Sequence, residues 1–75
     1  MYFTVAAKVD VRGIHQTLRP YMIYAGQSEQ EARAELASEA KWYYDRGFNL
    51  VTYTPDYALM DDGTEAICIK VKNGI

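Results

Sequence analysis

The stretch Ser28–Gly47, SEQEARAELASEAKWYYDRG, is typical of one capped amphipathic helix. Ser28 and Glu31 form the S-x-x-E capping box, in which each side chain accepts a hydrogen bond from the backbone N–H of the other residue. Small and apolar residues recur at helical spacing and form one stripe: Ala32, Leu36, Ala40 and Tyr43. Gly47 suits the position just after a helix end. The sequence therefore predicts a helix that lays a narrow, alanine-rich face on a sheet.

Three consecutive aromatic residues, Trp42, Tyr43 and Tyr44, stand near the end of this helix. Neighbours on a helix point about 100° apart, so the three rings cannot share one face. With Leu36 at the centre of the buried stripe, Tyr43 is predicted to join the core and Tyr44 to lie at its boundary. Trp42 falls on a charged flank with Arg46. One interpretation is a cation–π contact across one helical turn, and the other is an anchor for a protein partner.

Alternating residues before the helix predict two strands. In the segment 2–11, the more apolar face is expected to meet the core and consists of Phe3, Val5, Ala7, Val9 and Val11. The other face carries Tyr2, Thr4, Ala6, Lys8 and Asp10. A turn is expected at Arg12–Ile14. In the segment 21–25 one face is predicted to hold Tyr21, Ile23 and Ala25, with Met22 and Tyr24 opposite. Pro20 indicates a sheet edge, a strand start or a bulge.

The segment after the helix predicts further strands. The segment 48–54, FNLVTYT, is one β region, and the segment 56–72 is typical of a hairpin that turns at Asp61-Asp62-Gly63. Its core face is predicted to carry Ile67, Ile69 and Val71. The order β-β-α-β-β-β indicates an α+β fold over residues 1–75 as one domain. We expect a single antiparallel sheet of four to five strands with one helix packed on one face, the second face being uncovered.

The composition favours a folded chain without cofactor or metal. Cys68 is the single cysteine, so no intramolecular disulfide forms and a reducing cytoplasm is expected. His15 is the single histidine and no CxxC or HxxxH pattern is present, so the sequence predicts neither a zinc site nor catalysis. The start of the chain lacks the features of a signal peptide, and no window of about 18 apolar residues predicts a membrane helix. We therefore expect a protein that is not an enzyme.

Two binding surfaces follow from these elements. The first is a surface for a host protein or nucleoprotein complex, formed by Trp42, Tyr44, Glu35, Glu39, Arg46, Tyr57 and Asp61. The second is a nucleic-acid face on the open side of the sheet, formed by Tyr2, Lys8, Lys70 and Lys72. The net charge of −2 disfavours direct contact with nucleic acid. Self-assembly into a homodimer, through the open face or an edge strand, is a third interpretation.

The junction YMIYAGQSEQEARAEL, Tyr21–Leu36, joins an alternating strand to a capped helix as many small domains do. In length, strand order and single-helix plan the whole chain resembles small phage-encoded inhibitor proteins, among them certain anti-CRISPR proteins. This resemblance implies a non-enzymatic protein that blocks a host nucleoprotein or enzyme by occupying part of its surface, in the host cytoplasm. It transfers no functional residue, because no motif is shared.

Overall fold

Five strands and one helix make up the part of the chain that the computed structural model describes, residues 1–9 and 20–74. In chain order the elements are β1 (Tyr2–Val9), β2 (Tyr21–Gly26), α1 (Glu29–Tyr44), β3 (Asn49–Thr54), β4 (Tyr57–Asp61) and β5 (Ala66–Asn73). The predicted order β-β-α-β-β-β is confirmed. The predictions for Asp10, Val11 and the turn at Arg12–Ile14 fall outside the described residues.

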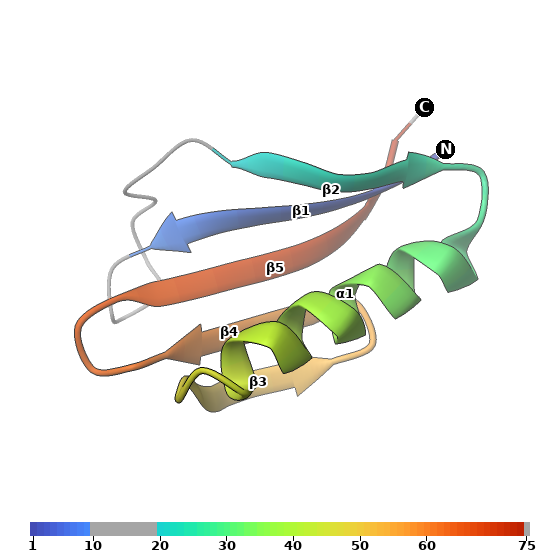
Figure 1. Cartoon of the computed structure of the whole chain (residues 1–75). Coiled ribbons are helices and arrows are strands. Elements are labelled where there is room, and N and C mark those ends of the chain that lie inside the picture. Colours follow the sequence, from blue (N-terminus) through green and yellow to red (C-terminus); the bar gives the residue numbers. More distant parts are fainter. Residues whose placement is uncertain (10–19, 75) are drawn as a thin grey trace.

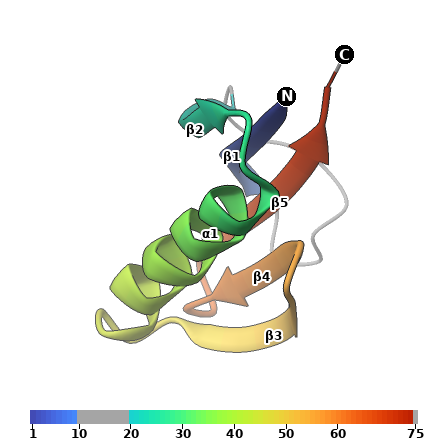
Figure 2. The ribbon, with the colours of Figure 1, turned by 90° about the vertical axis from the view of Figure 1, so that its right-hand side faces the viewer.

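The described strands form one antiparallel sheet in the order β2-β1-β5-β4-β3. β5 lies at the centre, so the first and last strands of the chain are neighbours. Figures 1 and 2 show α1 lying across one face of this twisted sheet. The helix packs on β1, β2, β4 and β5, and β3 has the least contact with it. The predicted α+β architecture is confirmed.

The helix begins at the predicted cap. The Ser28 Oγ accepts a hydrogen bond from the Glu31 N–H at 3.1 Å, as the capping box requires. The second bond of the capping box, from the Ser28 N–H to the Glu31 carboxylate, is replaced. That carboxylate instead accepts from the hydroxyl of Tyr24 at 2.8 Å. The Ser28 N–H in turn donates to that hydroxyl at 3.4 Å. The Tyr24 hydroxyl thus bridges Ser28 and Glu31, and it joins the edge strand β2 to the start of α1.

Glycines with positive φ mark two of the chain reversals downstream, the one after α1 and the one between β4 and β5. After α1, Gly47 has φ 94° and the Phe48 N–H donates back to the Tyr43 carbonyl at 3.1 Å. In the β4–β5 turn, Gly63 has φ 91°. The Asp62 carboxylate accepts from the N–H groups of two turn residues, Thr64 and Glu65. These bonds to its charged form lower the pKa of Asp62, and they confirm the predicted hairpin turn.

The core lies between α1 and the centre of the sheet. Its buried residues are Ala6, Leu36, Ala40, Ala58, Met60, Ile67 and Ile69, with Ile23, Tyr43, Phe48 and Val71 packed against them. The predicted helix stripe and the predicted core face of the last strand are therefore confirmed. Small residues on both the helix and the sheet allow the two to approach closely. A second cluster, Leu59, Ala66 and Cys68, is buried on the other side of the sheet with Val9 and Tyr57 against it.

The predicted faces of β1 are wrong. Ala6 is fully buried in the core beneath α1. Thr4 is also fully buried on that side, and its hydroxyl donates to the Ala32 carbonyl at 2.7 Å. The residues predicted for the core, Phe3, Val5, Ala7 and Val9, alternate with these and lie on the opposite face. The close approach of the helix explains the reversal, because only small side chains fit between the two backbones.

The predicted faces of β2 are wrong as well, because the strand carries a bulge. Tyr24 pairs with Thr4, but the next pair joins Met22 to Val5, which leaves Ile23 as an extra residue. Ile23 packs on the core, and Tyr21 and Tyr24 both bond to side chains of α1. The bulge therefore turns Tyr24 from its predicted face toward the helix.

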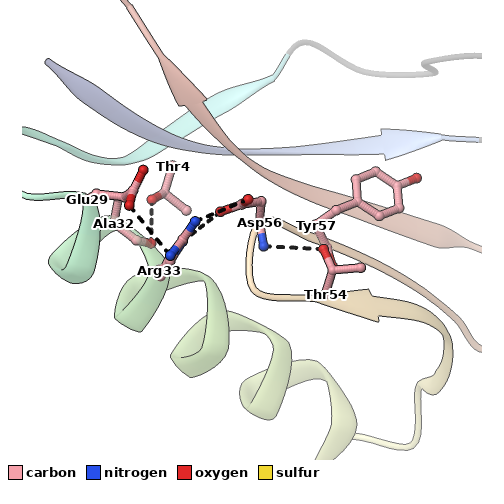
Figure 3. A network of polar contacts seen from close by, with 7 residues as sticks. All are labelled: Thr4, Glu29, Ala32, Arg33, Thr54, Asp56 and Tyr57. Carbon is pink, nitrogen blue, oxygen red and sulfur yellow. Dashed lines mark hydrogen bonds and ion pairs between the residues drawn. The ribbon is translucent and has the colours of Figure 1, made fainter.

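Arg33 ties the first turns of α1 to the turn between β3 and β4, as Figure 3 shows. Its Nε donates to Asp56 Oδ1 at 2.7 Å, and its Nη1 lies 3.5 Å from Glu29 Oε1. The Asp56 N–H donates to Thr54 Oγ1, and its carbonyl accepts from the Val71 N–H. These ion pairs are exposed and stabilise the fold by less than about 1 kcal/mol each. Their effect is to fix the β3–β4 turn against the helix.

Candidate functional site

One side of α1 presents an aromatic ring among charged groups. We call this surface the tryptophan flank, formed by Glu35, Glu39, Trp42 and Arg46 on α1 and Tyr21 on β2. Trp42, the single tryptophan of the chain, is 48% exposed. The guanidinium carbon of Arg46 lies 3.5 Å from the centroid of its ring, and Arg46 Nη1 donates to the Trp42 carbonyl at 3.0 Å. The cation–π contact and the outward position of Trp42 are confirmed.

Hydrogen bonds from Tyr21 of β2 to α1 hold the tryptophan flank together. The Tyr21 hydroxyl donates to Glu39 Oε2 at 2.9 Å and lies 3.3 Å from the Tyr43 hydroxyl. Burial, together with these hydrogen bonds, raises the pKa of Tyr21 far above its usual value. Tyr21 therefore stays protonated and continues to donate. The Trp42 ring packs edge-on against Tyr43 with ring centroids 4.9 Å apart, and this contact fixes the orientation of the exposed ring.

An acidic row continues the tryptophan flank toward the start of α1. It consists of Glu31, Glu35 and Glu39, spaced four residues apart along one side of the helix. Glu31 accepts from Tyr24, and this hydrogen bond raises the pKa of Tyr24. Glu39 is held by Tyr21 in the same way. An aromatic anchor beside ordered carboxylates is suited to contact with a basic protein surface.

Three residues predicted for the same surface lie elsewhere. Tyr44 follows Trp42 by two positions and therefore projects from the opposite flank of α1. Tyr57 and Asp61 alternate with the core residues of β4, so they lie on the face away from α1. Figure 3 shows the Tyr57 ring turned away from the helix. The structure brings together Glu35, Glu39, Trp42 and Arg46, and the prediction of one seven-residue surface is wrong.

The predicted nucleic-acid face is also divided. β1 and β5 are neighbours, as that interpretation requires. However, Tyr2 and Lys8 lie on the α1 side of the sheet, and Lys70 and Lys72 lie on the opposite side. Lys8 Nζ is 2.6 Å from Glu65 Oε1, and this hydrogen bond raises the pKa of Lys8. The four residues do not form one basic patch, because the face assignment of β1 was inverted.

A groove that the sequence did not predict lies between α1 and β3. It has a volume of about 270 Å³ and is lined by Ala37, Ala40, Lys41, Tyr44, Leu50 and Tyr53. We call it the α1–β3 groove. A signal for it exists in the sequence, since the segment 49–54 carries large apolar residues and no charge. That signal becomes interpretable only once β3 is known to be an edge strand.

Tyr57 gives a pH-dependent prediction. Burial, and then its hydrogen bond to the Cys68 thiol, raises the pKa of Tyr57 to about 12. The fold thus favours the neutral phenol. Its contribution to stability is complete below the unfolded pKa of about 10 and is lost as the pH rises through 12. Difference titration of tyrosinate absorbance between wild type and Tyr57→Phe is expected to show one phenol ionising near pH 12. Ionisation of this phenol near pH 10 would contradict the burial of Tyr57.

Within residues 1–9 and 20–74, no group of three His, Cys, Asp or Glu side chains is placed to hold a metal ion. His15 lies outside these residues. No described helix combines the length and the apolar character needed to cross a membrane. Comparison with protein families, curated proteins and solved structures finds no match.

Proposed function

We propose that this protein is a small, non-enzymatic binding protein that inhibits a host protein or nucleoprotein complex stoichiometrically, by covering part of its surface. The observation that carries this proposal is the half-exposed Trp42 with Arg46 stacked on its ring. The few residues that carry most of the binding energy of a protein interface are enriched in tryptophan and arginine. Because this ring is already held by Arg46 and Tyr43, it loses little conformational freedom when a partner covers it.

The charge of the tryptophan flank favours a partner with a basic surface. Glu35 and Glu39 lie on the same side of α1 as the anchor, and the acidic row continues from them to Glu31 at the start of the helix. Arg46 is the cation stacked on the ring. Basic surfaces are the usual phosphate-contacting surfaces of nucleic-acid-binding proteins and nucleoprotein complexes. Occupying such a surface would exclude its nucleic acid. The likeness in length and element order to phage-encoded inhibitors, including anti-CRISPR proteins, adds an anti-defence role in the host cytoplasm to the proposal.

Trp42→Ala tests this function. We expect the affinity of the variant for its partner to fall at least about 30-fold, since a hot-spot tryptophan contributes about 2–4 kcal/mol. The melting temperature is expected to fall by only about 4–8 °C, because one cation–π contact and one edge contact are lost. The measurement is affinity capture from host lysate with mass spectrometry, followed by titration of the purified partner. Trp42 fluorescence reports burial directly, because the chain has no other tryptophan.

Tyr44→Ala is the matched control. Tyr44 is 59% exposed and lies on the other flank of α1, so its loss is expected to leave capture unchanged. Equal capture of one protein by wild type and Trp42→Ala would contradict the assignment of the binding surface. Capture of nucleic acid alone, released by modest salt, would contradict the proposed class of partner.

A further inference from the structure

The α1–β3 groove is apolar and open, and it lies away from the tryptophan flank. Its floor is formed by Leu50 and Tyr53, each 50% exposed, and Tyr44 forms its wall on the helix. All six residues of β3 are exposed. β3 is also the described strand that α1 covers least. The groove therefore joins an apolar surface to the hydrogen-bonding edge of the sheet.

The two sheet edges differ in how their side chains are used. On β2, Tyr21 and Tyr24 are turned onto α1 and bonded to its glutamates. On β3 the large side chains face the open groove, and the strand carries no charged residue. Proteins usually protect an edge strand with lysine, proline or an inward-pointing charge. The β3 edge has none of these side chains, and a bulge is the protective feature that it does carry. Its large side chains stay exposed beside the groove, so this edge remains open to pairing with another strand.

We propose that a second copy of this chain covers the α1–β3 groove, with the two β3 strands running antiparallel about a two-fold axis. The bulge between Leu50 and Thr52 places both Leu50 and Tyr53 on the α1 side of the sheet. When the axis passes between Val51 and Thr52, Leu50 of each copy lies across from Tyr53 of the other. Leucine beside tyrosine is a stabilising cross-strand contact, and the symmetry makes it twice.

The area and the charge of this surface agree with a small dimer interface. The exposed parts of Tyr44, Leu50, Val51 and Tyr53 offer about 400 Å² of apolar surface, since a whole tyrosine buries roughly 150–250 Å². The backbone and threonines of β3 extend this toward the ~800 Å² per partner of a standard interface. Lys41 is the cation at the rim and is paired with Asp45, so no like charges meet on β3. A dissociation constant on the order of 10 µM is expected.

Sedimentation equilibrium between about 1 and 500 µM tests the dimer. The molar mass of wild type is expected to rise from 8.6 kDa toward twice that value, and added salt is not expected to weaken the association. Leu50→Lys is expected to remain at 8.6 kDa with an unchanged circular dichroism spectrum, because position 50 is half exposed. If this variant fails to fold, Tyr44→Lys carries the same test. Wild type that stays monomeric at the highest concentration would overturn the proposal.

Hydrogen exchange decides which edge is used. Amides of β3 are expected to gain protection when wild type is concentrated, and Leu50→Lys is expected to abolish this gain. β2, the other edge strand, is the internal control and should exchange equally at both concentrations. Protection that appears on β2 instead would overturn the proposal. Trp42→Ala is expected to dimerise like wild type. The dimer proposal and the proposed inhibitory function are therefore tested independently of each other.

Discussion

Leu36→Ala is expected to lower the free energy of unfolding by about 3–5 kcal/mol. Leu36 is fully buried at the centre of the helix face, in one cluster with Met60, Ile67 and Ile69. Three of the buried residues in this cluster, Ala6, Ala40 and Ala58, are alanines, whose side chains are too short to fill the vacated space. The truncation therefore leaves most of its cavity open, and the cost lies toward the upper end of the usual range.

This loss is large for so short a chain. A domain of 75 residues has a total stability of roughly 4–11 kcal/mol. Urea unfolding at about 0.5 µM protein, roughly twentyfold below the dissociation constant expected for the proposed dimer, is the appropriate measurement. Leu50→Ala is the matched control, because it removes the same atoms from a half-exposed leucine and is expected to cost less than about 1.5 kcal/mol. Equal losses in the two variants would contradict the position of the core.

The helix and its flanks were predictable because their signals are local. The spacing of Leu36 and Tyr43, the cap at Ser28 and the glycine at Gly47 are fixed by a period and by short-range hydrogen bonds. The same period places Trp42 opposite Tyr44 and beside Arg46. The part of the tryptophan flank that α1 supplies is therefore predictable from the sequence. Its contact with β2 does not, since it depends on the packing of α1 against a strand.

The faces of the strands were not predictable for a different reason. Alternation shows that a strand has two faces, but which of them is buried depends on what packs there. In β1 the more apolar residues, such as Val5, lie away from the helix, because α1 approaches too closely for anything larger than Ala6 or Thr4. The second buried cluster, around Leu59 and Cys68, also gives the far face of the sheet an apolar interior. Because both faces of the sheet bury apolar residues, side-chain hydropathy does not show which face of β1 lies against α1.

The strand pairings add a second cause of error. A bulge shifts the alternation by one residue, and neither bulge here is marked by glycine or proline. In β2 the bulge turns Tyr24 toward α1, where its hydroxyl completes the helix start. In β3 it places Leu50 and Tyr53 on one side and so creates the floor of the α1–β3 groove. The α1–β3 groove and the Tyr24 contact at the helix start thus depend on bulges that only the cross-strand register reveals.

A pair of substitutions at adjacent positions of β1 tests the inverted face. Ala6→Glu is expected to abolish the folded state at pH 7. Position 6 is fully buried beneath α1 among Leu36, Ala40 and Ile69, so a carboxylate there is enclosed by apolar side chains. Burying an unpaired charge costs several kcal/mol, and the added volume costs about 1–3 kcal/mol more. Together these exceed most of the stability available to a chain of this length.

Val5→Glu is expected to fold, although Val5 is the more hydrophobic residue of the two. Val5 is half-buried on the other face and lies directly opposite Lys70 of β5. The new carboxylate loses about 1 kcal/mol of apolar burial and regains about 0.2–1 kcal/mol from the cross-strand pair with that lysine. Circular dichroism melting at pH 7 compares the two variants. A folded Ala6→Glu with an unfolded Val5→Glu would mean that α1 covers the valine face of β1, as hydropathy alone suggested.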